Sequence, residues 1–472
     1  TQMEISGKIA VWALAGLIGG AFTACGSSDS DEILTSTDGI HGTVTPPSTE
    51  PGAVDPTVTG VLTSSQAGKY IEATATQLKQ LCNPQDQKGA VESLMVIANV
   101  LDSYGVAGQN SDMGYSRALA KATRSMAQNT ESGDYAGISR AVQQVSNSFT
   151  VNPRDYLGVY TPVYDDEEEE YVWAKTADSF NAIIFRSEKD RVEVSLTVSG
   201  ESWTGKFDTV DYDYDGYWDD KNQVWVSNDT EITTHWTVNV PAKLTFVMSH
   251  NGDNAVSAVV ESNYSESAHT FAVKSSAQLA NISANAEVTG IDTSISEKCN
   301  ASIGSSRVLY SVAEVKGTNL CNRQMLEQLG NAGPDAIASQ IDNLFKGATA
   351  KVDLLDRIQI SSSCSSLKAI VANGDYDEEV LQEVNAFAAA LNSSVTTTLN
   401  FGNTDYEQGT ITWGAMPHTS WGYTWYDVEP MVALAGGSAM SFGDFIDSGA
   451  LNGSINAIKG IVNTYRGAFG LD

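Results

Sequence analysis

The densest group of potential metal ligands in this sequence is an acidic loop. Asp211, Asp213, Asp215 and Asp219 follow the spacing D-x-D-x-D-G-x-x-D, and Tyr217 stands between the last two carboxylates. Alternate carboxylates in such a loop converge on one hard cation, the glycine permits a sharp turn, and the Tyr217 carbonyl adds another oxygen. The sequence therefore predicts a structural Ca²⁺ site in a loop between two strands. The alternative is a solvated acidic turn.

A second candidate site is a group of aromatic residues near the C-terminal end. Trp413, Trp421 and Trp425 follow one another closely, with tyrosines between and beside them. Aromatic faces can stack on sugar rings, so these residues are candidates for contact with a glycan ligand. Aromatic residues are also common in ordinary strands, and packing within a strand is the alternative.

Signals of catalysis are sparse. The sequence contains no G-x-S-x-G, H-E-x-x-H, Walker or dinucleotide-binding motif, and its five histidines are scattered. A pair of carboxylates for glycoside hydrolysis has no fixed sequence spacing, so a hydrolase is the last-ranked alternative. We predict that the protein is not an enzyme.

The charge balance excludes one class of partner. The chain of 472 residues has 58 acidic and 27 basic side chains, a net charge of −31. Nucleic-acid binding needs clustered Lys and Arg, so we predict no nucleic-acid partner. Hydrophobic residues make up 42% of the chain, which is typical of a folded protein.

The N-terminal region carries a secretion signal. Lys8 precedes a 16-residue apolar run, residues 9–24, which as a helix would span ~24 Å and so fall short of a membrane. The residues from Phe22 to Cys25 resemble a bacterial lipobox, in which the cysteine is acylated. This resemblance implies a lipoprotein signal peptide over 1–24 and attachment to a membrane through acyl chains, palmitate among them, on Cys25.

The segment after Cys25 is acidic and rich in serine. Residues 26–32 resemble the export tag that Bacteroidota place after the lipidated cysteine, which implies an outer-membrane lipoprotein at the cell surface. The start of a solvated linker is the alternative. Proline, serine and threonine continue without apolar periodicity, so we predict that 25–63 is a flexible tether.

Four further cysteines follow in a chain predicted to be exported, which allows two disulfides with three connectivities. Cys299 and Cys321 flank a predicted strand and are the favoured pair. Free thiols are the alternative. The remaining two are Cys82 and Cys364.

Hydrophobic periodicity divides the rest of the chain into three blocks. Residues 64–150 have helical spacing, 151–317 alternate with period two, and 318–472 return to helices with a short aromatic hairpin. We predict an α+β fold in one body over 64–472. Its antiparallel β-meander would have about eight to ten strands, with helices before and after it packing on one face.

These features favour a lipid-anchored envelope protein that acts as a binding or assembly component. The main alternative is a carrier that holds a lipid or another apolar ligand in a curved sheet, and a glycan-binding module ranks third. A carrier needs an internal apolar cavity, whereas helices should fill the sheet face of an assembly component. The sequence leaves open whether the partner is a protein, a glycan or a lipid.

Overall fold

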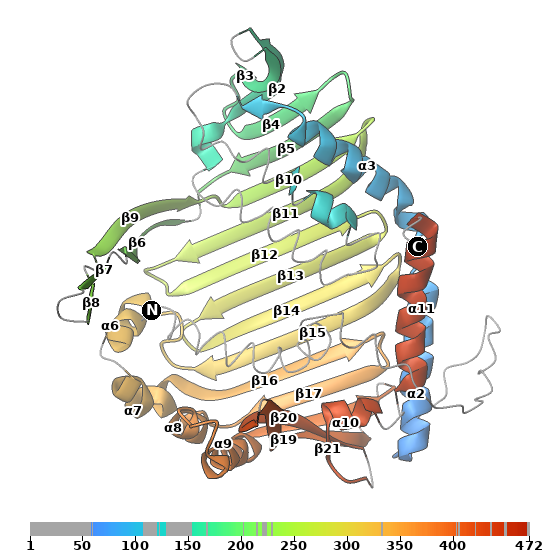
Figure 1. Cartoon of the computed structure of the whole chain (residues 1–472), viewed down its shortest axis with the longest axis vertical. Helices are drawn as coiled ribbons and strands as arrows, with labels where there is room; N and C mark the ends of the chain where they lie inside the picture. The colour runs from blue at the N-terminus through green and yellow to red at the C-terminus, as the bar shows by residue number, and fades with distance from the viewer. Residues whose placement is uncertain are drawn as a thin grey trace.

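One β-sheet of 17 strands forms the frame of the molecule (Figure 1), and two separate two-stranded ribbons accompany it. Between residues 203 and 240 only the backbone is described. In this computed structural model the described residues are 58, 60–106, 120–121, 123–128, 153–166, 169–201, 203–213, 216–219, 224–227, 230–331, 334–402, 404, 406–420, 422–434, 437–447 and 451–469.

Most of the sheet is an antiparallel meander in which each strand pairs with the next one along the sheet. In spatial order its strands are β4 (Ala182–Ser187), β5 (Val192–Ser199), β10 (Lys243–His250), β11 (Asp253–Ser265), β12 (Thr270–Leu279), β13 (Ile282–Ile291), β14 (Ser294–Ile303), β15 (Ser306–Gly317), β16 (Phe345–Leu354), β17 (Ile358–Cys364), β18 (Val395–Phe401), β19 (Glu407–Ser420), β20 (Tyr423–Leu434) and β21 (Met440–Ser441).

Three more strands extend the sheet beyond β4. The strand β2 (Gly158–Asp165) pairs in parallel with β4 and antiparallel with β3 (Glu170–Ala177). The two-residue strand β1 (Gly105–Val106) then pairs in parallel with β3. The sheet is therefore mixed at this end and antiparallel elsewhere.

Side chains alternate between two faces of the sheet, as the period of two predicts. We call the face that carries Phe246 and Phe401 the inner face and the opposite face the outer face. The turn between β10 and β11 consists of Asn251 and Gly252, the residue pair most typical of a two-residue hairpin, and both have positive φ, 58° and 90°. Such a two-residue turn matches the twist of a tight hairpin.

Helices come before, within and after the strands. The first, α2, begins with a capping box between Thr63 and Gln66, which satisfies two free backbone N–H groups. The helices are α2 (Ser64–Leu81), α3 (Gln85–Asp102), the 3-10 turn η1 (Pro153–Tyr156), α6 (Arg323–Asn331), α7 (Pro334–Leu344), α8 (Lys368–Asn373), α9 (Leu381–Ser394), α10 (Phe442–Asp447) and α11 (Asn452–Phe469).

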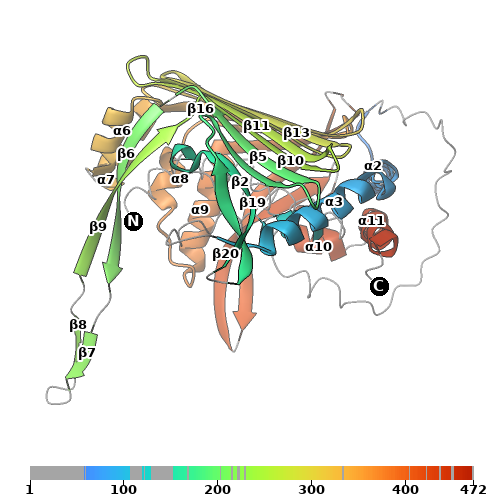
Figure 2. The same cartoon turned by 90° about the horizontal axis from the view of Figure 1, so that it is seen from above.

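The hydrophobic cores lie between these helices and the inner face. Leu94 and Ile97 of α3 are fully buried in one cluster with Met248 of β10. At the other end of the sheet, Tyr70 of α2 stacks on Phe401 of β18, with ring centroids 4.8 Å apart. Figure 2 shows that the sheet is curved and that these helices lie on its concave side. Helices therefore pack on the inner face near both ends of the sheet.

The α+β class is confirmed, but the predicted number of strands is wrong, since the sheet has 17 rather than eight to ten. Two of the additional strands, β16 and β17, lie in the part of the 318–472 block that was predicted to be helical, whereas β18 lies within the predicted hairpin at 396–426. The sequences of β16 and β17 are rich in alanine, serine and threonine, so the contrast between their two faces is weak. Residues 138–148, whose sequence also predicts a helix, lie outside the described residues.

A long ribbon leaves the sheet between β5 and β10. Its strands β6 (Trp203–Asp213) and β9 (Thr230–Val240) are antiparallel, and β7 (Gly216–Asp219) pairs with β8 (Val224–Ser227) beyond them. Figure 2 shows the ribbon projecting from the concave side of the sheet. The predicted acidic loop therefore lies far from the helices that cover the inner face.

Candidate functional site

The middle of the inner face consists mostly of small apolar side chains. Three inner-face positions on each of β12, β13, β14 and β15 lie side by side in the register of the sheet. We call these residues the central floor. They are Val273, Ser275 and Ala277 on β12, Ala284, Ala286 and Val288 on β13, Glu297, Cys299 and Ala301 on β14, and Leu309, Ser311 and Ala313 on β15.

The described helices leave the central floor uncovered. The helix α3 packs on β5, β10 and β11, whereas α7 and α9 pack on β16 and β18 to β20. Among the described residues no helix packs across the middle of β12 to β15. Val273 is 40% exposed and Ala284 is also exposed, whereas Ser311 and Ala313 are buried and the other residues of the floor are half-buried. An apolar sheet face normally packs against a second layer, so this exposure marks a surface available to a ligand.

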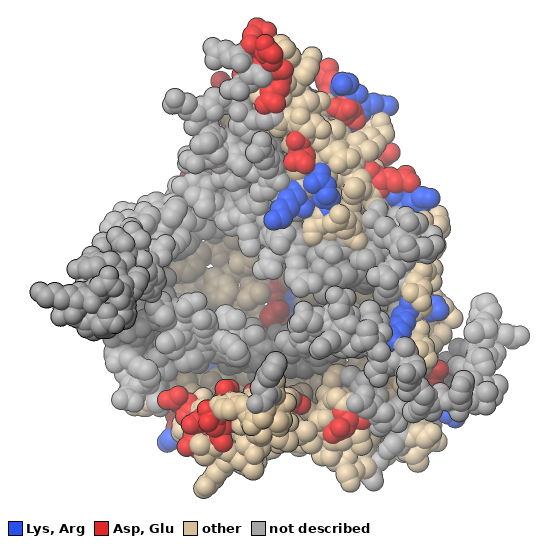
Figure 3. Space-filling view, viewed as in Figure 1, with Lys and Arg blue, Asp and Glu red and all other residues tan. Residues whose placement is uncertain are grey.

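Helices border the central floor on several sides. The helix α3 borders it along β11, and α8 packs near β16, where Ile370 contacts Ala348 and Cys364. At one end of β14, Ile303 packs with Cys82, which follows α2, and with Ile461 of α11. The floor spans ~14 Å along the strands, from its first to its third position on each strand, and ~15 Å across four strands. Figure 3 shows a hollow over part of the inner face.

Glu297 is the only acidic residue of the central floor. In the register of the sheet it lies between Val288 of β13 and Ala313 of β15. Burial raises the pKa of the Glu297 carboxyl. Burial, and then the charge of Glu297, also raises the pKa of the Cys299 thiol next to it on the same face. The carboxylate therefore lies in apolar surroundings that disfavour its charged form.

The raised pKa of Glu297 has a consequence for stability. In the unfolded chain this carboxyl ionises near pH 4.5, and in the folded protein it ionises at higher pH. Its ionisation therefore opposes folding at neutral pH and does not do so below pH ~4, where both states are protonated. We expect Glu297→Gln to raise the melting temperature at pH 7 by ~1 °C and to leave it unchanged at pH 4. Scanning calorimetry of both proteins at each pH measures this, and an equal shift at both pH values would contradict it.

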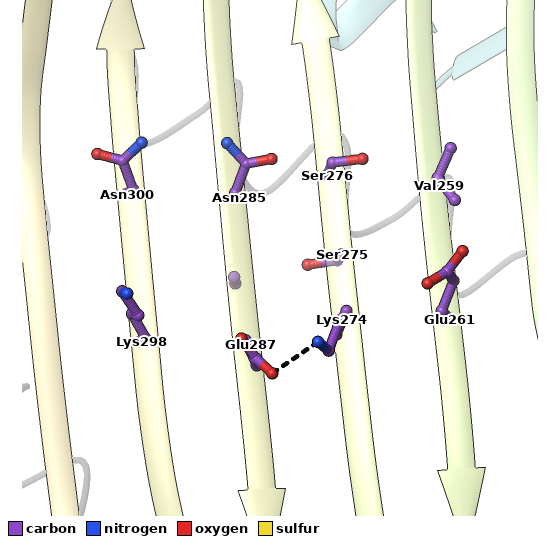
Figure 4. Close-up of a pocket in the computed structure, with 10 residues that line it drawn as sticks. Val259, Glu261, Lys274, Ser275, Ser276, Asn285, Glu287, Lys298 and Asn300 are labelled. Atoms are coloured by element: carbon purple, nitrogen blue, oxygen red, sulfur yellow. Dashed lines mark ion pairs between the residues drawn. The ribbon is translucent and has the colours of Figure 1, made fainter.

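The outer face of the same strands is polar and charged. A row of charges of alternating sign crosses five strands, and a shallow hollow of about 390 Å³ lies along it (Figure 4). Lys243 is paired with Glu261 at 2.8 Å, and Lys274 with Glu287 at 2.9 Å, while Lys298 lies across from Glu287. Exposed pairs of this kind contribute little to stability and suit a sheet face in water.

The predicted Ca²⁺ loop lies in the projecting ribbon. Asp211 and Asp213 end β6, and Tyr217 and Asp219 belong to β7, which confirms that strands flank the loop. Asp215 and the side chains of the whole loop lie outside what the structure describes. Where side chains are described, no group of three or more His, Cys, Asp or Glu is arranged to hold a metal. The Ca²⁺ site stays a prediction.

The aromatic residues do not form one shared surface. Trp425 pairs across the hairpin with His418, whereas Trp413 lies five residues before His418 on β19 and so faces the opposite side. His418 stacks on Trp425 with ring centroids 5.7 Å apart, and its Nε2 lies 2.9 Å from a carboxylate oxygen of Glu429. Trp421 lies outside the described residues. A glycan platform that uses Trp413 and Trp425 together is not present.

The predicted disulfide between Cys299 and Cys321 is not formed, and both residues are thiols. The geometry explains this. Leu320 donates a backbone hydrogen bond to Asp292 at 3.0 Å, which places Cys321 at the start of the β13–β14 turn. Cys299 lies about 17 Å further along β14, and a disulfide needs Cα atoms within ~7 Å. Burial, and then the charge of Asp292, raises the pKa of Cys321 to about 11.

Sequence reasoning missed the central floor as a site, although a signal for Glu297 was present. A single acid interrupts the apolar positions of β14, which are Ile295, Cys299, Ala301 and Ile303. The predicted lipidation site, Cys25, and the predicted tether lie outside the described residues, apart from residues 58 and 60–63.

Comparisons with protein-family models, with curated proteins and with solved structures find no match to this chain. Among the described helices none combines the length and the apolar character that a membrane crossing requires. The function must therefore be argued from the central floor itself.

Proposed function

We propose that this protein is a non-enzymatic binding protein of the cell envelope and that its central floor binds an apolar ligand, the acyl chain of a lipid. The observation that carries the proposal is a partly exposed patch of small apolar side chains, on which no described helix packs extensively, within a face that helices cover elsewhere. Among the functions predicted from the sequence, this one corresponds to a carrier with a curved sheet.

The sizes of the side chains support this proposal. Phe246 and Phe401 fill the space between sheet and helix on either side of the floor, and both are buried. The floor itself has alanine at five positions, so it leaves room above the strands. Each CH₂ group of a ligand that moves from water to such a surface contributes about 0.8 kcal/mol. An acyl chain would therefore bind mainly through contact area along the strands.

The lipobox-like sequence supports the proposed location. Acyl chains on Cys25 would attach the protein to a membrane, with the predicted tether between that anchor and the described domain. Display at the cell surface remains part of the proposal, as does a structural role for Ca²⁺ in the acidic loop. A protein anchored to a membrane by acyl chains lies next to lipids that could serve as its ligands.

The test is the affinity for an uncharged fluorescent alkyl probe. Ala286→Phe places a ring in the middle of the floor, and we expect the Kd to rise at least tenfold, which corresponds to about 1.4 kcal/mol. The matched control is Asn285→Phe, which adds a ring at the adjacent residue on the outer face and should change the Kd less than twofold. Fluorescence titration of the three proteins measures these constants.

Two outcomes would overturn the proposal. One is the absence of saturable binding to the native protein, and the other is an equal loss of affinity in both variants. Circular dichroism melting curves should show that Ala286→Phe and Asn285→Phe both remain folded under the conditions of the titration.

A further inference from the structure

Glu297 gives the central floor one polar point within an apolar surface. Its neighbours across the strands are Val288 and Ala313, and its nearest neighbours on the same face of β14 are Ile295 and Cys299. A carboxylate in such surroundings is costly unless a partner forms charged hydrogen bonds with it.

The described part of the chain supplies no such partner. No ion pair or hydrogen bond of the Glu297 carboxylate is found among the described residues. The nearby lysines are Lys298 on β14 itself, Lys316 on β15 and Lys274 on β12, and all three occupy the alternate positions that face outward. The sheet thus separates Glu297 from the cations that lie closest to it in the sequence.

This arrangement discriminates between the polar ends of ligands. An ammonium group could donate charged hydrogen bonds to Glu297, and such bonds are about twice as strong as neutral ones. A free carboxylate would instead meet a like charge in apolar surroundings, where repulsion is stronger than in water. A hydroxyl group could donate one neutral hydrogen bond.

We propose, resting on the proposed function, that the ligand is an amphiphile with an ammonium group and that Glu297 binds this group while the acyl chain lies on the central floor. Glu297 is then the residue that determines specificity among apolar ligands. Glu297 would thus favour a lipid with an amine over a free fatty acid with the same apolar chain.

The experiment compares dodecylamine, dodecanol and dodecanoate as competitors of the fluorescent alkyl probe, with the full chain at low micromolar concentration. For the native protein we expect dodecylamine to bind at least tenfold more tightly than dodecanoate, with dodecanol between them. In Glu297→Gln we expect the affinity for dodecylamine to fall at least tenfold and the affinity for dodecanol to change less than threefold. The affinity for dodecanol, compared between the native protein and Glu297→Gln, shows whether the central floor is intact.

The matched control is Glu287→Gln, which removes the same charge from β13 on the outer face. Glu287→Gln should leave the affinities for all three competitors unchanged. If the amine binds only by non-specific attraction to an acidic protein, its affinity should fall equally in Glu297→Gln and Glu287→Gln, and that result would overturn the inference. Equal binding of the three competitors to native protein, or a preference that persists in Glu297→Gln, would also overturn it while leaving the proposed function in place. If none of the three competes and the probe itself does not bind, both proposals fail.

Discussion

Replacement of Trp173 by alanine is expected to lower the free energy of unfolding by about 3–5 kcal/mol. Trp173 of β3 is 1% exposed, and its ring meets Tyr104 and Phe185 edge-on, each with centroids 5.3 Å away. Its indole N–H donates a hydrogen bond to the carbonyl of Leu101 at 3.4 Å, which joins the end of α3 to the sheet. The substitution therefore leaves a cavity and weakens the attachment of a helix that borders the central floor.

Urea unfolding of the native protein and Trp173→Ala measures this loss. Phe180→Ala is the control, because it also removes an aromatic ring but at a position that is 91% exposed. We expect the control to change the free energy of unfolding by less than about 0.5 kcal/mol. A comparable effect of the two substitutions would show that the cluster around Trp173 does not stabilise the fold.

Gly317→Ala is expected to destabilise the protein by about 3 kcal/mol, the upper end for overpacking in a core. Gly317 is buried at the end of β15, where its N–H donates to Thr293 at 3.1 Å. A Cβ atom at this position would overlap the carbonyl oxygen of Leu344 and the side chain of Leu320. That oxygen already accepts a hydrogen bond from Thr318, so the backbone cannot move away without breaking it.

Gly89→Ala provides a control with the opposite expected sign. Gly89 is exposed within α3, and a Cβ atom there would meet nothing within 4 Å. Alanine favours a helix over glycine by up to about 1 kcal/mol, so this variant should melt at a higher temperature. If Gly317→Ala melts at the temperature of the native protein, β15 and β16 are less closely packed than the structure shows.

The sequence alone was sufficient for elements with strong periodicity. The valines and leucine of β5, the apolar stripe of α3 and the turn at Asn251 each have a pattern that one period explains. The strands β16 and β17 escaped prediction because small or polar residues occupy both of their faces. Local pattern predicts an element only when its two faces differ in polarity.

The candidate site could not be predicted from the sequence for a different reason. Alternation along β13 shows that Ala284 and Ala286 share a face, but it does not show whether a helix covers that face. The same limit applies to Trp413 and Trp425, whose opposite orientation depends on the register of the hairpin. Cys299 and Cys321 were paired from their separation in sequence, whereas the extended strand between them keeps them apart.

The position of α2 has a consequence for how the chain reaches its folded state. Tyr70 stacks on Phe401, Gly60 and Leu62 bind the side chain of Gln408 at 3.0 and 2.8 Å, and α2 packs along α11. The first helix thus finds these partners in the last quarter of the chain, whereas the strands of the meander pair with close neighbours in sequence. Hairpins can form as soon as they leave the ribosome, but the segment around α2 must wait for partners such as Gln408, which follows Leu62 by 346 residues. The docking of α2 is therefore a late step, after most of the sheet has been synthesised.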